Sequence, residues 1–231
     1  MKVNFADRRE RLSNLTRGLP ISTDLPLFKE VPVDLTLFHI LKSAVSTFLA
    51  ASLVAWRGEG VDPKRNLLLE DALGELTRIP NRTPNGSVMA QRENTFEFNL
   101  VHRYVSKILR RLKIDDRIEA LHLPLIVRLV DGRPDQAVDS RPYATAKLHT
   151  DVWNGEPPTA LSVFIPTLGD IKEAGVEFFE PDEEEMKKMM RAYSDYNAGA
   201  HLLERSYRYD CRWRPGYIYF VDPLLLHRTM K

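Results

Sequence analysis

The chain has 231 residues, 43% of them apolar, with 33 Lys and Arg against 32 Asp and Glu. This length buries a sizeable core without covalent cross-links, and the balanced charge argues against nucleic acid or an anionic membrane as a partner. A single cysteine, Cys211, excludes an intramolecular disulfide framework and a multi-thiolate zinc site. We therefore expect a globular protein in the reducing environment of the cytoplasm.

Helices are expected in the first half of the chain. Residues 1–30 contain prolines and turn formers, which predict an irregular arm. Helical spacing of apolar residues then predicts helices over 35–56, 62–76 and 96–112. The first of these is long and apolar enough to span a membrane, but charged or polar side chains in its first turns favour a buried helix. No membrane partner is expected.

Strands are expected in the second half, because β-branched and aromatic segments alternate there with turn residues. The expected strands cover residues 125–130, 143–151, 160–167, 176–179, 205–213 and 217–221. Acidic residues followed by basic ones predict a helix over 182–196. This segregation indicates an α+β fold, and short strands of this kind suit a jelly roll.

We expect one structural domain built from two regions. Residues 1–122 would form an arm and helices that support a barrel. Residues 123–231 would form the jelly-roll core, with a helical insertion at about 182–204.

Three residues form a candidate metal site. His149 and Asp151 are two residues apart on an expected strand, so their side chains point to the same face. His227 follows the expected strand 217–221, and folding can bring it alongside. Two imidazoles and one carboxylate suit non-haem Fe(II), with coordination positions left open. A His-x-Asp pair alone is a weak signal, and we interpret the remaining histidines as packing or surface residues.

The surrounding segments resemble a known family. They resemble the Fe(II)/2-oxoglutarate-dependent dioxygenases of the phytanoyl-CoA-dioxygenase-like branch, with a weaker similarity to oxygenases of bacterial sugar and aminoglycoside gene clusters. The resemblance covers about residues 125–231, and the matching segments are 143–153, 160–166, 175–179, 214–222 and 226–229. It implies a double-stranded β-helix with a cupin-like core. It also implies that His149, Asp151 and His227 bind iron, and that 2-oxoglutarate and O2 are cosubstrates.

The family usually holds the far carboxylate of 2-oxoglutarate with an arginine about ten residues beyond the distal histidine, through a bidentate ion pair. The sequence given stops before that position. Either the chain is cut short or another cation substitutes, and Arg128 and Lys147 are the candidates. Arg128 is equally well interpreted as a surface or structural residue. The hydroxyl of Thr229, two residues past His227, is a further candidate for the same carboxylate.

Two aromatic residues are candidates for the substrate pocket. Trp153 follows Asp151 by two residues and is expected to edge the pocket, with an aromatic plug in the barrel as the alternative. Tyr219 is interpreted either as a wall residue or as core. The insertion at 182–204 would form a lid that excludes water, or a plain solvated helix.

The expected function is hydroxylation, or another oxidation, of a C–H bond in a small polar metabolite such as a sugar or aminosugar. Two alternatives remain open at this point. One is a non-catalytic cupin-like protein that binds a metal or 2-oxoglutarate. The other is a metal-dependent sugar epimerase or isomerase that uses the metal as a Lewis acid. The sequence leaves the oligomeric state open.

Overall fold

A computed structural model describes residues 4–57, 74–130, 132, 135–157, 159–170 and 175–230. The chain forms two compact units. The strand unit comprises Met1–Pro32, Gly132–Pro166 and Asp170–Lys231, and the helical unit comprises Val33–Asp131 and Thr167–Gly169. This partition differs from the expected regions 1–122 and 123–231, because the N-terminal segment belongs with the C-terminal strands.

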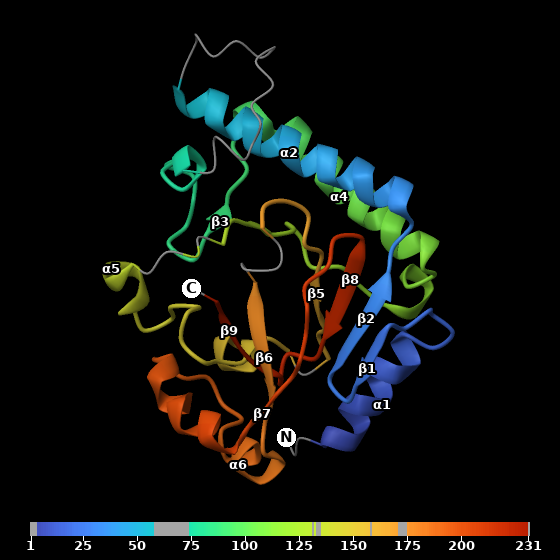
Figure 1. Cartoon of the computed structure of the whole chain (residues 1–231), viewed down its shortest axis with the longest axis vertical. Helices are drawn as coiled ribbons and strands as arrows, with labels where there is room; N and C mark the ends of the chain where they lie inside the picture. Colours follow the sequence, from blue (N-terminus) through green and yellow to red (C-terminus); the bar gives the residue numbers. More distant parts are fainter. Residues whose placement is uncertain are drawn as a thin grey trace. The chain divides into compact units, whose positions relative to one another are not determined.

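The helical unit is built on two long helices that lie side by side (Figure 1). These are α2 (Leu35–Arg57) and α4 (Thr95–Arg111), and they confirm the helices expected over 35–56 and 96–112. The unit also contains β3 (Ser87–Val88), η1 (Arg92–Asn94), η2 (Asp115–Arg117) and β4 (Val127–Arg128). Most of the helix expected over 62–76 lies outside the described residues. The strand expected over 125–130 is reduced to β4, which pairs with β3.

Apolar residues at helical spacing bury one face of α2. The buried apolar residues are Phe38, Leu41, Ala44, Val45, Phe48, Leu49 and Leu53, and Ser52 is buried with them. Within the described part of the chain, α2 is long and apolar enough to cross a membrane by length and composition alone, a property that the core helices of soluble proteins share. Its buried face packs on α4, where the rings of Phe48 and Phe98 lie 4.9 Å apart between centroids.

A buried polar link joins α2 to the start of α4. Asn94 Nδ2 donates to Ser52 Oγ at 2.8 Å, and both side chains are buried. We expect Ser52→Ala to lower the free energy of unfolding by about 1–2 kcal/mol, because it leaves the Asn94 amide without this partner in the core. Urea denaturation measures the change. Ser43→Ala is the matched control, because Ser43 makes the same hydrogen bond to the carbonyl four residues earlier but is exposed. Equal effects of the two changes would contradict the prediction.

The strand unit contains two antiparallel sheets. One has the strand order β1-β2-β8-β5 and the other β7-β6-β9. The strands are β1 (Thr23–Leu25), β2 (Phe28–Pro32), β5 (Ser162–Phe164), β6 (Val176–Glu180), β7 (Tyr207–Arg208), β8 (Tyr217–Val221) and β9 (Leu226–Thr229). The helices are α1 (Phe5–Leu15), α5 (Gln136–Asp139), η3 (Asp151–Asn154), α6 (Glu183–Lys188) and η4 (Tyr196–Arg205). The protein therefore has an α+β fold, as expected.

Residues 4–30, the described part of the N-terminal segment, form regular elements, so the expectation of an irregular arm there is wrong. This segment forms α1, β1 and β2, and β2 pairs with β8 along its whole length. The prolines separate these elements from one another. Pro20 lies between α1 and β1, and Pro26 lies in the turn between β1 and β2, where proline and turn residues are favoured.

Several expected elements are shorter than their sequence patterns indicate. Strands over 176–179 and 217–221 are confirmed as β6 and β8. The expected strands over 160–167 and 205–213 shrink to β5 and β7, and residues 143–150 form turns with a single bridge at His149. Alternation of apolar residues does not indicate how many residues of a segment pair with a neighbouring strand, and in these segments few residues do.

The helix expected over 182–196 ends early for a long-range reason. It begins as expected, because the Asp182 side chain accepts hydrogen bonds from the first backbone N–H groups of α6. The carbonyl of Met189 then accepts a hydrogen bond from Trp153 Nε1, and the N–H of Tyr193 donates to the carbonyl of Trp153. In a continued helix, Tyr193 would instead donate to Met189. Trp153 therefore occupies the backbone groups that the helix needs.

Aromatic side chains fill the space between the two sheets. Phe28 on β2 and Phe178 on β6 have ring centroids 5.3 Å apart, and Phe164 on β5 lies 5.9 Å from Phe178. Trp213 and Tyr219 pack into the same cluster.

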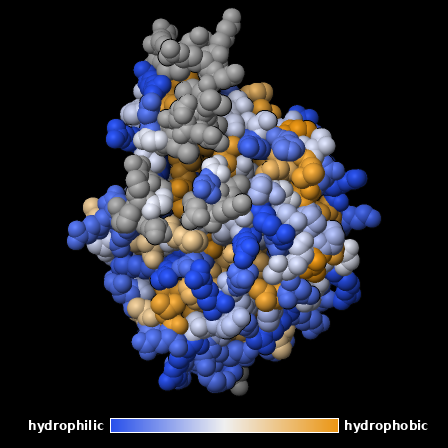
Figure 2. Space-filling view, in the orientation of Figure 1, coloured by the Kyte–Doolittle hydropathy of each residue, from blue (hydrophilic) through white to orange (hydrophobic). Residues whose placement is uncertain are grey.

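The face of the molecule in view in Figure 2 is mostly hydrophilic, with small apolar areas between the polar side chains.

Candidate metal centre

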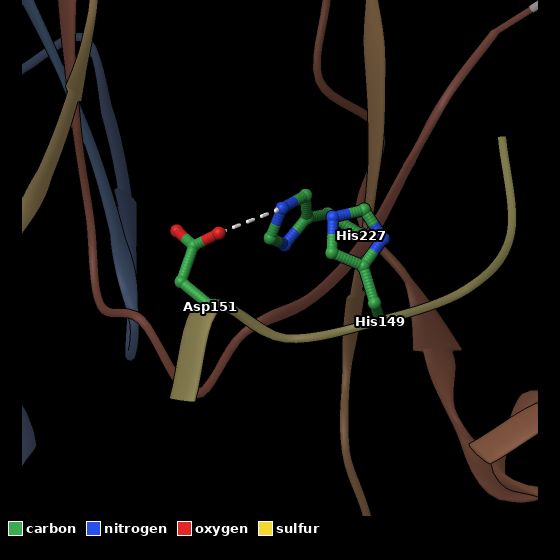
Figure 3. Close-up of side chains that lie close together, drawn as sticks. All are labelled: His149, Asp151 and His227. Carbon is green, nitrogen blue, oxygen red and sulfur yellow. Dashed lines mark ion pairs between the residues drawn. The ribbon is translucent and has the colours of Figure 1, made fainter. Parts of the chain in front are cut away.

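The strand unit brings His149, Asp151 and His227 together. Each offers one possible ligand atom, and these atoms lie within 4.8 Å of one another. Figure 3 shows the carboxylate of Asp151 and both imidazoles gathered in one place. The two histidines are buried, while the Asp151 side chain is 23% exposed. The three residues singled out in the sequence therefore form one cluster.

Backbone hydrogen bonds join the two histidines directly. His149 N–H donates to the carbonyl of His227 at 2.9 Å, and His227 N–H donates to the carbonyl of His149 at 2.8 Å. His149 lies on the edge of β9 opposite β6, because His227 is also paired with Phe178 of β6. This single bridge fixes the two imidazoles beside each other, with ring centroids 4.2 Å apart, without a regular strand at residues 143–151.

A hydrogen bond at Nδ1 orients each imidazole. His149 Nδ1 lies 2.8 Å from the carbonyl oxygen of Lys147, and His227 Nδ1 lies 3.0 Å from that of Leu225. A carbonyl accepts only, so these contacts assign a proton to Nδ1 in each ring, and Nε2 is then the ring atom that can serve as a metal ligand. This is the arrangement usual for metal-binding histidines.

Asp151 is held by different elements. Ser162 Oγ on β5 donates to Asp151 Oδ2 at 2.7 Å. Asp151 Oδ1 lies 3.5 Å from His227 Nε2, which is longer than an ordinary N–H···O hydrogen bond. Burial raises the pKa of Asp151, but its interactions with His227, the Ser162 hydrogen bond and His149 together lower that pKa well below its ordinary value. The carboxylate is therefore ionised at neutral pH.

These features fit a divalent metal ion. Two imidazoles that carry their proton on Nδ1 and one ionised carboxylate are in the protonation states that metal ligands require. The donor set suits iron and also other first-row metals, so it does not by itself select Fe(II).

Tyr196 covers one face of His149, and sequence reasoning did not single it out. The two rings are nearly parallel, at 10°, with centroids 4.4 Å apart. Tyr196 begins η4 and is buried, and the preceding residue, Asp195, accepts a hydrogen bond from Lys147 Nζ at 3.1 Å. The insertion therefore packs on the segment that carries His149. Nothing in residue spacing marks an aromatic residue in an insertion as the neighbour of a ligand.

The two residues considered for the substrate pocket lie in the core, which was the alternative for Trp153 and one of the two interpretations of Tyr219. Trp153 is buried and donates from Nε1 to the carbonyl of Met189. The hydroxyl of Tyr219 accepts a hydrogen bond from the backbone N–H of Arg214 at 2.8 Å and lies 3.2 Å from Glu30 Oε1. These contacts are those of packing residues.

The three residues expected to hold 2-oxoglutarate have different surroundings. Arg128 is exposed on β4 and belongs to the helical unit. The ammonium of Lys147 is engaged by Asp195, although the Lys147 carbonyl orients His149. Thr229 lies two residues from His227 on β9, so their side chains share one face of the strand. Among Arg128, Lys147 and Thr229, Thr229 is therefore the residue that shares a strand face with the candidate ligand His227.

Cys211 is half-buried, and its thiol is expected to be a poor nucleophile. Burial raises the pKa of its thiol to about 12, with Glu30 and Asp210 adding to the rise. At pH 8 we expect iodoacetamide to alkylate it roughly 10³-fold more slowly than an ordinary thiol, because the thiolate is the reacting form. Alkylation in urea provides the reference rate. A native rate within tenfold of that reference would contradict the prediction.

Comparison with known proteins adds no relative. Searches against protein-family models, curated proteins and solved structures gave no match.

Proposed function

We propose that the protein is an Fe(II)- and 2-oxoglutarate-dependent oxygenase that hydroxylates a C–H bond of a small polar metabolite, such as a sugar or aminosugar. The observation that carries the proposal is the convergence of His149, Asp151 and His227, with both Nδ1 atoms on carbonyl oxygens. Three protein ligands leave the remaining coordination positions to a cosubstrate and O2. Iron, 2-oxoglutarate and O2 would supply the oxidant.

In this proposal, residues of the chain bind the metal and the cosubstrate and orient the metal ligands. The two imidazoles and the carboxylate of Asp151 hold the metal, and Ser162 fixes the orientation of that carboxylate. Tyr196 shields one face of His149 from water. Thr229 would offer its hydroxyl to the cosubstrate carboxylate, and Arg128 and Lys147 remain candidates for its counter-charge.

The sheet arrangement supports a double-stranded β-helix. Two antiparallel sheets, β1-β2-β8-β5 and β7-β6-β9, pack aromatic side chains between them. The bridge from His149 to His227 adds a further pairing beside β9. A metal site at the edge of a closed jelly roll would have this construction. With one half-buried cysteine, the cytoplasm remains the proposed location.

One observation favours a second candidate, a metal-binding protein without oxygenase activity. The ammonium of Lys147, a candidate counter-charge for 2-oxoglutarate, is already paired with Asp195. A site that binds the metal but holds the cosubstrate weakly would bind without turnover.

Succinate formation tests the proposal. The protein is loaded with Fe(II) under anaerobic conditions, mixed with 2-oxoglutarate and air, and assayed for succinate. We expect turnover that requires Fe(II) and is lost in Asp151→Ala but kept in His201→Ala, which changes an exposed histidine. Saturable 2-oxoglutarate binding without succinate would favour the binding protein. Isomerisation of a sugar that continues without O2 would favour the epimerase.

A further inference from the structure

A buried ion pair links the N-terminal helix to the turn before β9. Arg8 on α1 is 4% exposed and Asp222 is 1% exposed. Arg8 Nε lies 2.8 Å from Asp222 Oδ1 and 3.0 Å from Oδ2, and Arg8 Nη2 lies 2.7 Å from Oδ1. Arg8 Nε thus donates to both carboxylate oxygens, and Nη2 adds an ion-pair contact, so the carboxylate of Asp222 is held at both oxygens.

Asp222 in turn shapes the backbone that follows it. Its Oδ1 accepts a hydrogen bond from the N–H of Leu224 at 2.9 Å, and its carbonyl accepts one from the N–H of Leu225 at 2.9 Å. The N–H of Asp222 donates to the carbonyl of Leu27, which anchors the turn on the N-terminal hairpin. The carboxylate gripped by Arg8 is therefore also the cap of the turn.

The turn ends at the group that orients His227. The carbonyl of Leu225 lies 3.0 Å from His227 Nδ1. Hydrogen bonds therefore run in sequence from Arg8 to Asp222, through the turn, and on to the imidazole. A buried ion pair contributes little net stability compared with apolar packing of the same volume, so stability alone is a poor explanation for this one.

We propose that Arg8 is a positioning residue for His227 and acts through Asp222 and the turn at residues 222–225. This inference rests on the proposed metal centre. Loss of the pair would let the turn shift and misalign the imidazole, while the three ligands themselves remain present.

The test separates positioning from stability. The double variant Arg8→Met/Asp222→Leu removes both charges together and so leaves neither one buried and alone. Co2+ is the probe, and its dissociation constant and visible absorption spectrum are measured by titration. We expect 10–100-fold weaker Co2+ binding and an altered spectrum, the loss typical of groups that orient metal ligands. Arg8→Lys, which keeps the charge but loses the planar fork, should show a smaller loss.

Leu12→Ala is the matched control, because Leu12 is buried on the same helix and makes no part of the hydrogen-bonded path. It should lower stability without changing the Co2+ affinity of the folded protein. Co2+ binding by the double variant within twofold of wild type, with the same spectrum, would overturn the inference.

A metal-free measurement separates failure of the inference from failure of the metal centre. Hydrogen exchange of the Leu225 and His227 amides should speed up in the double variant by more than that of the β8 amides. Absence of Co2+ binding in the wild type would refute the metal centre. Unchanged exchange at Leu225 and His227 would refute the positioning role whatever the metal result.

Discussion

Replacing His227 with alanine is expected to weaken metal binding by more than 100-fold. The change removes one of three ligands, which should exceed the roughly 10–100-fold loss seen when only an orienting partner is lost. The backbone bridge to His149 uses the N–H and carbonyl of residue 227, so the fold around the site should persist. Anaerobic titration with Fe(II), or titration with Co2+, measures the dissociation constant.

The same change should abolish stabilisation by the metal. A ligand that binds only the folded state at 100 times its dissociation constant adds about 2.7 kcal/mol to the free energy of unfolding. Wild type should show this gain in thermal denaturation and His227→Ala should not. His201→Ala, on the exposed surface of η4, is the matched control and should behave as wild type. Equal metal binding by all three proteins would eliminate the proposed centre.

Gly199→Ala should destabilise the strand unit by about 1–3 kcal/mol or more. A Cβ atom at this position would lie 1.9 Å from Cη2 and 2.4 Å from Cζ3 of Trp153. The indole cannot easily move away, because it is buried and its Nε1 is bound to the carbonyl of Met189. Trp153 lies in η3, which begins at Asp151, so metal affinity should fall as well. Urea denaturation and Co2+ titration measure the two effects.

A double-mutant cycle identifies the cause. Trp153→Phe removes the part of the ring that the new methyl group would meet, so the two changes together should cost less than the sum of each alone. Ala200→Ser, at an exposed neighbouring position, should change stability by no more than about 0.5 kcal/mol. Strictly additive effects would show that Gly199→Ala acts somewhere other than the indole.

Local sequence patterns correctly predicted the elements whose apolar residues repeat at helix or strand spacing. Helix α2 and strand β8 lie where apolar spacing placed them, and the pair His149 and Asp151 was visible as a two-residue motif. Each of these signals lies within one short segment. The convergence of His227 on the motif was a hypothesis about folding, and the reciprocal backbone bridge now supplies the contact.

The remaining features depend on partners far away in the chain. Trp153 ends α6 by donating a hydrogen bond to Met189, 36 residues away, and accepting one from Tyr193, 40 residues away, and no pattern inside 182–196 indicates this. The grip of Arg8 on Asp222 joins residues 214 positions apart. Tyr196 reaches His149 by stacking, which leaves no periodic trace. Such pairs require either a structure or covariation between related sequences.

The pairing of β2 with β8 has a consequence for how the chain is made. Phe28 faces Val221 and Pro32 faces Tyr217, so an early strand depends on one that the ribosome releases much later. Until then the nascent chain carries a strand with one unpaired edge, which invites pairing between neighbouring copies. Contacts of such long sequence separation also slow folding. The interval between synthesis of β2 and synthesis of β8 is therefore the period in which this chain is most exposed to aggregation.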